Sequence, residues 1–280
     1  MFFGGDFVYV LPKTRAIICP LCRAPLSVCG ASLVCAGGRR HTFDIARAGY
    51  VNLNLHSSAS GDAKEMADAR QRFLRQGYYA PLCEALSEAT GRGALLCDAG
   101  CGEGYYTECV AQGFDFTVGA DLSKYALALA GKSARRALCA GRLLYATASV
   151  YALPIADNVC DCVLNVFAPC AAEEFFRVLR PGGRLVIAAA GRDHLLEMKR
   201  FLYDEAVPNE ERRDYPKEMT LLTKFPVRRR AEIPGDALRT LFQMTPYFYR
   251  TKKDRADALG ALSSLSLTLD FEIRIYIKEA

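Results

Sequence analysis

The chain has 280 residues, of which 51% are hydrophobic and 24% are charged, so it can bury a sizeable core and is not expected to be intrinsically disordered. Its 36 Lys and Arg against 31 Asp and Glu give a net charge of +5, which permits contact with a polyanion without demanding it. No apolar run approaches the roughly 18 residues of a transmembrane helix, and the start lacks the features of a signal peptide. We therefore expect a cytoplasmic protein without a membrane partner, built from one large domain and a small one.

The 12 cysteines are distributed unevenly along the chain. Several lie singly inside apolar runs, which is typical of reduced thiols that act as small buried hydrophobes in an intracellular protein. These are Cys97, Cys109, Cys139, Cys160 and Cys162. The exceptions cluster near the N-terminus, where their spacing predicts a different chemistry.

Residues 19–55 form a distinct segment, preceded by an extension, residues 1–18, that has no clear pattern. The segment is rich in turns and has too few apolar residues for a core of its own, so it needs a metal ion or a disulfide to stabilise it. Its CxxC knuckle, residues 19–22, is followed by further Cys and His residues. These residues predict a small zinc-binding ribbon.

Several residues of this segment have the spacing of zinc ligands. Twelve residues separate Cys22 of the knuckle from Cys35, and His41 follows after five more. Zinc prefers four thiolate or imidazole ligands in a tetrahedron, and two facing pairs at this separation can supply them. Cys29 is a spare that can replace either member of the second pair. The alternatives are a CxxC without metal and a redox CxxC, and the latter lacks the βαβ context that it needs.

Residues 56–93 are predicted to be a polar linker followed by two helices. Asp62 as the N-cap and Glu65 three residues later form a start like a capping box, and apolar residues then recur at helical spacing. A second helix is expected from about Tyr79 to Thr90, because glycines follow it.

Residues 94–280 alternate short apolar strands with helical segments, which predicts an α/β fold with a mostly parallel sheet covered by helices on both faces. The strands are expected at residues 94–98, 116–121, 142–148, 157–167 and 184–190, the last of them after a turn at 180–183. The final stretch, 264–280, alternates strictly between apolar and polar residues, so we expect a strand that is antiparallel to its neighbour. Residues 193–262 are less regular.

A glycine-rich turn between the first strand and the next helix carries the clearest functional signal. Gly100, Gly102 and Gly104 form a GxGxG loop, with Asp98 two residues before the first glycine. Glycines here let the backbone pass close to a ligand, at the edge of the sheet where open α/β folds bind ligands. A dinucleotide fingerprint places its third glycine three positions after the second, where this chain has Tyr105. The spacing therefore favours a different nucleoside ligand.

Asp121 ends the second strand and is suitably placed to accept hydrogen bonds from both hydroxyls of a ribose. The loop and this acid together describe a cofactor that carries a nucleoside but no pyrophosphate. They resemble the S-adenosylmethionine site of class I methyltransferases, a Rossmann-like fold. A tight turn in a nucleotide-free sheet and a Rossmann dehydrogenase are the alternatives.

A series of motifs in a fixed order extends this resemblance to both parts of the chain. The motifs are CPLC, HTFDIARAGYVNL, GD with EMADAR, RFL, GYYAPL, DAGCGEGYYT, APC, RPGG, HLLEMK and QMTPY. In this order they resemble the 23S ribosomal RNA (guanine-N1)-methyltransferases of the RlmA type, which carry an N-terminal zinc ribbon on a class I methyltransferase domain. The likeness runs from about Cys19 to the last strand.

The resemblance implies specific site residues. Zinc would be held by Cys19, Cys22, Cys35 and His41, although more residues separate the last two than in the family. S-adenosylmethionine would contact Tyr79, Gly102, Glu103, Asp121 and His194.

The loop after the fourth strand is a candidate for positioning the substrate. Enzymes of class I that methylate amino groups of bases carry an Asn-Pro-Pro-aromatic motif there, and Asn165, Phe167 and Pro169 echo it. Phe167 stands where the family has Tyr, so a role that needs a hydroxyl is in doubt. An ordinary loop between a strand and a helix is the alternative.

The resemblance implies methylation of guanine N1 in 23S ribosomal RNA by S-adenosylmethionine, and a homodimer. The sequence singles out no residue as the acceptor of the N1 proton. Candidates for phosphate contacts are Arg39, Arg40, Arg47, Arg212, Arg213, Arg228–Arg230, Lys252 and Lys253. Two other hypotheses are a methyltransferase of a small molecule with a purely structural ribbon, and a non-catalytic protein that binds the cofactor and RNA.

Overall fold

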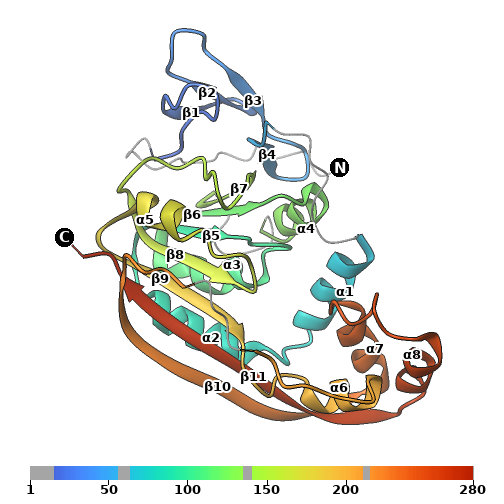
Figure 1. Cartoon of the computed structure of the whole chain (residues 1–280). Helices are drawn as coiled ribbons and strands as arrows, with labels where there is room; N and C mark the ends of the chain where they lie inside the picture. The colour runs from blue at the N-terminus through green and yellow to red at the C-terminus, as the bar shows by residue number, and fades with distance from the viewer. Residues whose placement is uncertain (1–15, 56–63, 135–140, 211–214, 280) are drawn as a thin grey trace.

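Eight strands form one sheet in a computed structural model that describes residues 16–55, 64–134, 141–210 and 215–279 (Figure 1). In sheet order they are β10 (Thr220–Pro234), β11 (Ser264–Ile277), β9 (Leu179–Ala190), β8 (Cys160–Val166), β5 (Gly93–Ala99), β6 (Phe114–Asp121), β7 (Leu143–Thr147) and β4 (Tyr50–Asn52). The pairs from β9 to β4 are parallel, and β11 is antiparallel to both β9 and β10. The predicted mostly parallel sheet with an antiparallel last strand is confirmed.

Helices pack against both faces of the sheet. They are α1 (Lys64–Leu74), α2 (Ala80–Thr90), α3 (Tyr105–Val110), α4 (Lys124–Ala134), α5 (Ala172–Val178), α6 (Leu196–Leu202), α7 (Gly235–Gln243) and α8 (Lys253–Gly260), with a 3-10 turn at Ala111–Gly113. The proposed N-cap Asp62 lies outside the described residues. Within the described part of the chain, no helix is long and apolar enough to cross a membrane.

Alternation along the strands separates two apolar cores. On β5, Leu96 faces the core formed with α1, α2, α3 and α7, whereas Leu95 and Cys97 face the opposite core. This second core also holds α5 and the buried residues of the N-terminal segment, such as Leu26 and Leu33. The ribbon therefore packs onto one face of the sheet, where it shares a core with the larger part of the chain.

The N-terminal segment contains a three-stranded sheet of β1 (Leu26–Cys29), β2 (Ser32–Cys35) and β3 (Thr42–Asp44). The last strand of the segment, β4, is not part of this small sheet. It pairs in parallel with β7 and forms an edge of the large sheet. An isolated bridge between Ile17 and Ile155 adds a second connection.

The long edge strand β10 was not predicted from the sequence. Only Ala231 and Ile233 of its 15 residues are buried and Phe225 and Val227 are half-buried, while the first five residues are exposed and Arg229 interrupts the alternation, so the pattern of a half-buried strand is incomplete. It also contains Pro226, which is tolerated because an edge strand needs hydrogen bonds on one side only. Pairing with β11 over almost its full length gives this segment its extended form.

The predicted turn at 180–183 lies inside β9. Cys160 and Cys162 of β8 pair with Leu179 and Arg184, so four residues of β9, 180–183, lie opposite a single residue of β8. Gly182 adopts a φ of +74°, which favours glycine.

The expectation that Cys109 is a reduced thiol is wrong in this structure. Cys109 of α3 forms a disulfide with Cys83 of α2, because the two helices pack together and bring the Cα atoms to 5.8 Å, within the range that permits a bridge. Cys97, Cys160 and Cys162 are free and buried as expected, and Cys139 lies outside the described residues.

Candidate active site and metal centre

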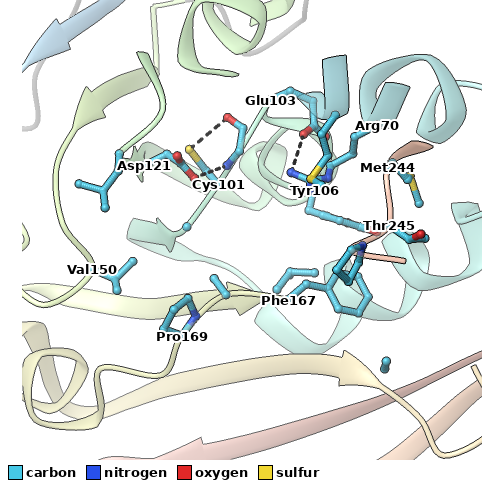
Figure 2. Close-up of a pocket in the computed structure, with 18 of the residues that line it drawn as sticks. Arg70, Cys101, Glu103, Tyr106, Asp121, Val150, Phe167, Pro169, Met244 and Thr245 are labelled. Atoms are coloured by element: carbon cyan, nitrogen blue, oxygen red, sulfur yellow. Dashed lines mark hydrogen bonds and ion pairs between the residues drawn. The ribbon is translucent and has the colours of Figure 1, made fainter. Parts of the chain in front are cut away.

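A cavity of about 660 Å³ opens at the carboxyl ends of the parallel strands, where open α/β sheets bind ligands. Figure 2 shows Asp121 and Val150 at one end, Met244 and Thr245 at the other, and Glu103 between them. The walls come from the loops after β5, β6, β7 and β8, from α1, and from the segment between α7 and α8.

The glycine loop after β5 forms one wall of the cavity. Gly100 has a φ of +88°, and a Cβ there would lie 2.4 Å from the Cβ of Ala168 in the loop after β8. Gly102 has a φ of +54°, and both glycines line the cavity. Gly104 does not, because its missing Cβ makes room for the Tyr145 hydroxyl on the other side of the loop.

Asp121 is fixed at the end of β6 by two backbone groups. Its Oδ2 accepts a hydrogen bond from the N–H of Gly102 at 2.9 Å, and its Oδ1 accepts one from the N–H of Ser123 at 2.8 Å. A carboxylate has about four acceptor positions in total. The arrangement can therefore hold the glycine loop and also accept hydrogen bonds from a diol in the cavity.

Asp98 lies behind the glycine loop and does not line the cavity. Its Oδ2 accepts a hydrogen bond of 2.6 Å from the Thr107 hydroxyl of α3. Burial raises the pKa of Asp98 to about 7; the carboxylates of Asp121 and Glu103 act in the same direction, and Thr107 opposes them. Asp98 thus connects β5 to α3, and from this position it can hold the glycine loop in place.

Tyr79 and His194 meet at the cavity although 115 residues separate them in sequence. The backbone N–H of Asp270 donates to Nδ1 of His194 at 3.2 Å, so the neutral imidazole carries its proton on Nε2. Nε2 lies 3.1 Å from the Tyr79 hydroxyl oxygen, which therefore accepts this proton. The hydroxyl proton of Tyr79 is then directed to another acceptor, and burial raises the pKa of Tyr79 so that the proton is retained.

The buried histidine makes the free energy of unfolding depend on pH. Burial and, to a smaller extent, the Lys199 ammonium lower the pKa of His194 to about 3, well below its ordinary value of 6.5. Between these values only the unfolded chain binds the proton, so the stabilising contribution is complete above the ordinary pKa. It decreases by up to about 1.4 kcal/mol per pH unit as the pH falls toward the folded value.

We therefore expect the unfolding free energy of His194→Gln to vary less steeply with pH than that of the parent in this window. Gln retains a polar group facing Tyr79 but does not titrate. Urea denaturation of both proteins at a series of pH values below neutrality measures the difference, and parallel profiles would contradict a buried neutral imidazole.

An aromatic wall faces the glycine loop. Phe167 adopts a φ of +53°, which is strained for a bulky residue and is typically maintained at functional sites. The residue is 46% exposed, and the centroid of its ring lies 6.2 Å from that of Tyr106 and 5.9 Å from that of Phe271. The ring of Phe167 is thus held at the cavity by its neighbours and is accessible for stacking.

Asn165 does not line the cavity. It is completely buried, and its amide nitrogen donates to the carbonyl oxygens of Ala99 at 2.9 Å and Pro169 at 3.1 Å. These bonds connect the loop after β8 to the end of β5. From this position Asn165 can maintain the conformation of the loop that carries Phe167.

Besides residues 148–151 of the loop after β7, three segments at or behind the cavity contain residues that were not identified from the sequence. α1 contributes Met66 and Arg70, and Nη1 of Arg70 lies 3.9 Å from Oε2 of Glu103. The segment after α7 contributes residues 244–247. Phe271 of β11 lies behind the cavity, with its ring 4.8 Å from that of Tyr79. The EMADAR and QMTPY motifs were signals for the first two, but no pattern indicated Phe271.

Cys19, Cys22, Cys35 and His41 converge in the ribbon, with all four donor atoms within 4.8 Å of one another. Nδ1 of His41 lies 3.4 Å from Sγ of Cys19 and 3.6 Å from Sγ of Cys35. The longer spacing before His41 thus does not prevent its convergence. Cys29 is exposed and is not part of the cluster.

The donor set fits a tetrahedral zinc ion. Zn–S bonds of about 2.3 Å at tetrahedral angles place two thiolates about 3.8 Å apart, and Sγ of Cys22 lies 3.9 Å from Sγ of Cys35. A Cβ at Gly37 would lie 3.0 Å from Sγ of Cys22, so glycine leaves room for the cluster. Such a closed set of three thiolates and one imidazole is typical of structural zinc.

Sequence comparisons match both parts of the chain. Residues 17–54 match the family profile described as "RlmA, N-terminal", a zinc ribbon, and residues 97–187 match that of a methyltransferase domain. The chain is 32% identical over 284 residues to the "Putative 23S rRNA (guanine-N(1)-)-methyltransferase YxjB" of Bacillus subtilis, covering 93% of this chain and 96% of that protein. It is 39% identical over 193 residues to the 23S rRNA (guanine(748)-N(1))-methyltransferase of Streptomyces fradiae, covering 66% of each.

Among solved structures, the YcgJ protein of Bacillus subtilis is similar in fold. It superposes with a TM-score of 0.50 at 15% identity, over 72% of this chain and all of that one.

Proposed function

Because the chain belongs to the family of RlmA-type 23S rRNA (guanine-N1)-methyltransferases, which have a class I methyltransferase fold, we propose that its cavity brings S-adenosylmethionine and one guanine together. The chain covers almost the full length of its Bacillus relative, including both the ribbon and the methyltransferase domain. The observation that supports this use of the cavity most directly is the pairing of Asp121 with the glycine loop at one of its ends.

We propose that the ribose of the cofactor is held at Asp121 and its methionine part near Tyr79 and Glu103. The carboxylate of Asp121 can accept hydrogen bonds from the ribose hydroxyls. The tautomer of His194 directs the hydroxyl proton of Tyr79 away from the imidazole, so Tyr79 can donate to a carboxylate. Gly100 and Gly102 allow close approach, whereas Asp98 and Gly104 support the loop from behind.

The substrate end of the cavity is proposed to lie at Phe167. N1 is on the Watson-Crick edge of guanine, so the base must be unpaired or flipped into a pocket, where an aromatic ring can stack on it. When bound, S-adenosylmethionine supplies an electrophilic methyl group on a sulfonium. The main task of Phe167 and the walls is to hold N1 in line with that methyl group, while Asn165 maintains the shape of the loop.

We propose four regions with different tasks: an extension at 1–18, the zinc ribbon at 19–55, linker and helices at 56–93, and the methyltransferase domain at 94–280. The profile matches at 17–54 and 97–187 support this division. The ribbon would contact 23S rRNA, with zinc maintaining its shape. A homodimer in the cytoplasm is also proposed, and light scattering of the purified protein tests the dimer.

Mass spectrometry of RNA tests the proposed function. Unmodified 23S rRNA transcribed in vitro, incubated with the protein and S-adenosylmethionine and digested to nucleosides, is expected to contain 1-methylguanosine. Asp121→Asn, which is expected to bind the cofactor about 100-fold more weakly or worse, serves as the control at a cofactor concentration that saturates the parent. A protein that binds S-adenosylmethionine but leaves every guanine unmodified would contradict the proposal.

A further inference from the structure

The segment between α7 and α8 continues the wall of the cavity onto the surface. Residues 244–247 line the cavity, and Phe248 and Tyr249 follow them directly. Phe248 and Tyr249 are 38% and 58% exposed, so two neighbouring aromatic residues are accessible at the surface. The two residues therefore lie directly beside one wall of the cavity along the chain.

This segment has a defined conformation. The N–H of Phe248 donates to the carbonyl of Thr245 at 3.2 Å, and the N–H of Arg250 donates to that of Tyr247 at 2.9 Å. Consecutive turns of this kind hold the backbone in place.

The two rings also pack against a buried ring of α7. Phe242, which is buried on α7, lies 5.4 Å from Phe248, and Phe248 lies 5.2 Å from Tyr249 with their planes at 82°. The ring of Tyr249 is therefore presented by an ordered support, which reduces the entropy that a ligand must remove on binding.

Positive side chains follow the two rings in the sequence. Arg250, Lys252 and Lys253 are all exposed, and within the described part of the chain none of them forms an ion pair. Exposed aromatic rings next to cations are typical of surfaces that bind single-stranded nucleic acid, because bases stack on the rings and phosphates contact the cations. The charge disfavours an apolar protein partner. We call Phe248, Tyr249, Arg250, Lys252 and Lys253 the exit strip.

We propose that the exit strip binds the unpaired nucleotides that flank the target guanine, with a base stacked on Tyr249 and phosphates at Lys252 and Lys253. This inference rests on the proposed function. A guanine turned into the cavity remains connected to its neighbours, and in this proposal the backbone leaves the cavity past residues 244–247. The strip lies where those neighbours emerge, and it would help to position the strand.

Substitution of Tyr249 tests the stacking. Tyr249→Ala is expected to weaken binding of unmodified 23S rRNA transcript, and to raise its KM, roughly 5- to 100-fold, the range of one base–aromatic stack. Tyr249→Phe retains the ring and should restore affinity. Leu222→Ala, at an apolar residue of β10 that is 51% exposed, is the matched control and should behave as the parent. Affinity for S-adenosylmethionine should be unchanged in all three, which also shows that they are folded.

Substitution of the lysines tests the phosphate contacts independently. The double variant Lys252→Ala/Lys253→Ala should reduce the slope of log affinity against log salt by about 1.4, at roughly 0.7 per phosphate of a single strand. The pair Lys217→Ala/Lys224→Ala removes the same charge from exposed residues outside the cavity and should change the slope less.

The outcomes separate this inference from the proposed function. If the parent methylates the transcript while Tyr249→Ala matches it in RNA affinity and KM, the exit strip is not the RNA contact and the function stands. A variant that changes the oligomeric state with unaltered RNA affinity would assign the strip to contact between copies of the chain and overturn the inference. A parent that methylates no guanine would overturn both.

Discussion

Asp121→Asn is expected to lower the affinity for S-adenosylmethionine about 100-fold or more. The change removes the negative charge and replaces one acceptor by an N–H₂ group, which cannot accept from the N–H of either Gly102 or Ser123. One hydrogen bond from the ribose then loses its acceptor, and the other goes to a neutral oxygen. A hydrogen bond to a charged group contributes about 1.5–3 kcal/mol and a neutral one about 0.5–1.5 kcal/mol, so the combined loss is roughly 2.5–4 kcal/mol, or about 100-fold or more. Isothermal titration calorimetry with the cofactor measures the effect.

The matched control is Asp115→Asn, at an exposed residue of the same strand, β6. This variant loses the same charge and should bind S-adenosylmethionine as the parent does. Equal affinities for Asp121→Asn and Asp115→Asn, with both variants folded by circular dichroism, would refute the assignment of the ribose site to Asp121.

Cys35→Ser is expected to abolish the zinc content of the protein and its activity on RNA. The parent should contain about one zinc per chain, and metal binding of this type contributes roughly 10–16 kcal/mol to the folding of small zinc domains. Since the ribbon has little apolar mass of its own, losing one of four ligands should unfold it. Atomic absorption and the transfer assay on 23S rRNA measure the two effects.

Affinity for S-adenosylmethionine should survive the loss of zinc, because no residue between 16 and 55 lines the cavity. Thermal stability should fall, since the ribbon shares a core with the sheet and β4 pairs with β7. Cys29→Ser is the control, as Cys29 is exposed and outside the cluster. Full zinc content in Cys35→Ser, or its loss in Cys29→Ser, would show that the ligand set is different.

Local patterns predicted the parts of the fold that depend on near neighbours in the sequence. The alternation of residues 264–280 identified β11, and the spacing of Gly100, Gly102 and Asp121 identified the ligand-binding edge of the sheet. The zinc cluster could also be predicted from the sequence, because a CxxC knuckle and a second pair of ligands lie close together along the chain. In each case the pattern and the conformation that it encodes lie within a few tens of residues.

Packing over longer distances decided the rest. Asp98, Gly104 and Asn165 occur in the right motifs, but their side chains or missing Cβ face away from the cavity. A motif identifies the turn, whereas the layers packed against that turn decide which atoms face the ligand. The strand form of β10 likewise comes from pairing with β11, which its own exposed residues do not reveal.

The sequence by itself determined the family, the parallel sheet and the two kinds of site, since motif spacing and strand period are local properties. Only the tertiary structure decided that His194 orients Tyr79, that Cys83 reaches Cys109, and that the segment after α7 lines the cavity. These contacts join segments that are distant along the chain. Their geometry depends on how the helices pack on the sheet, and no local pattern of residues encodes it.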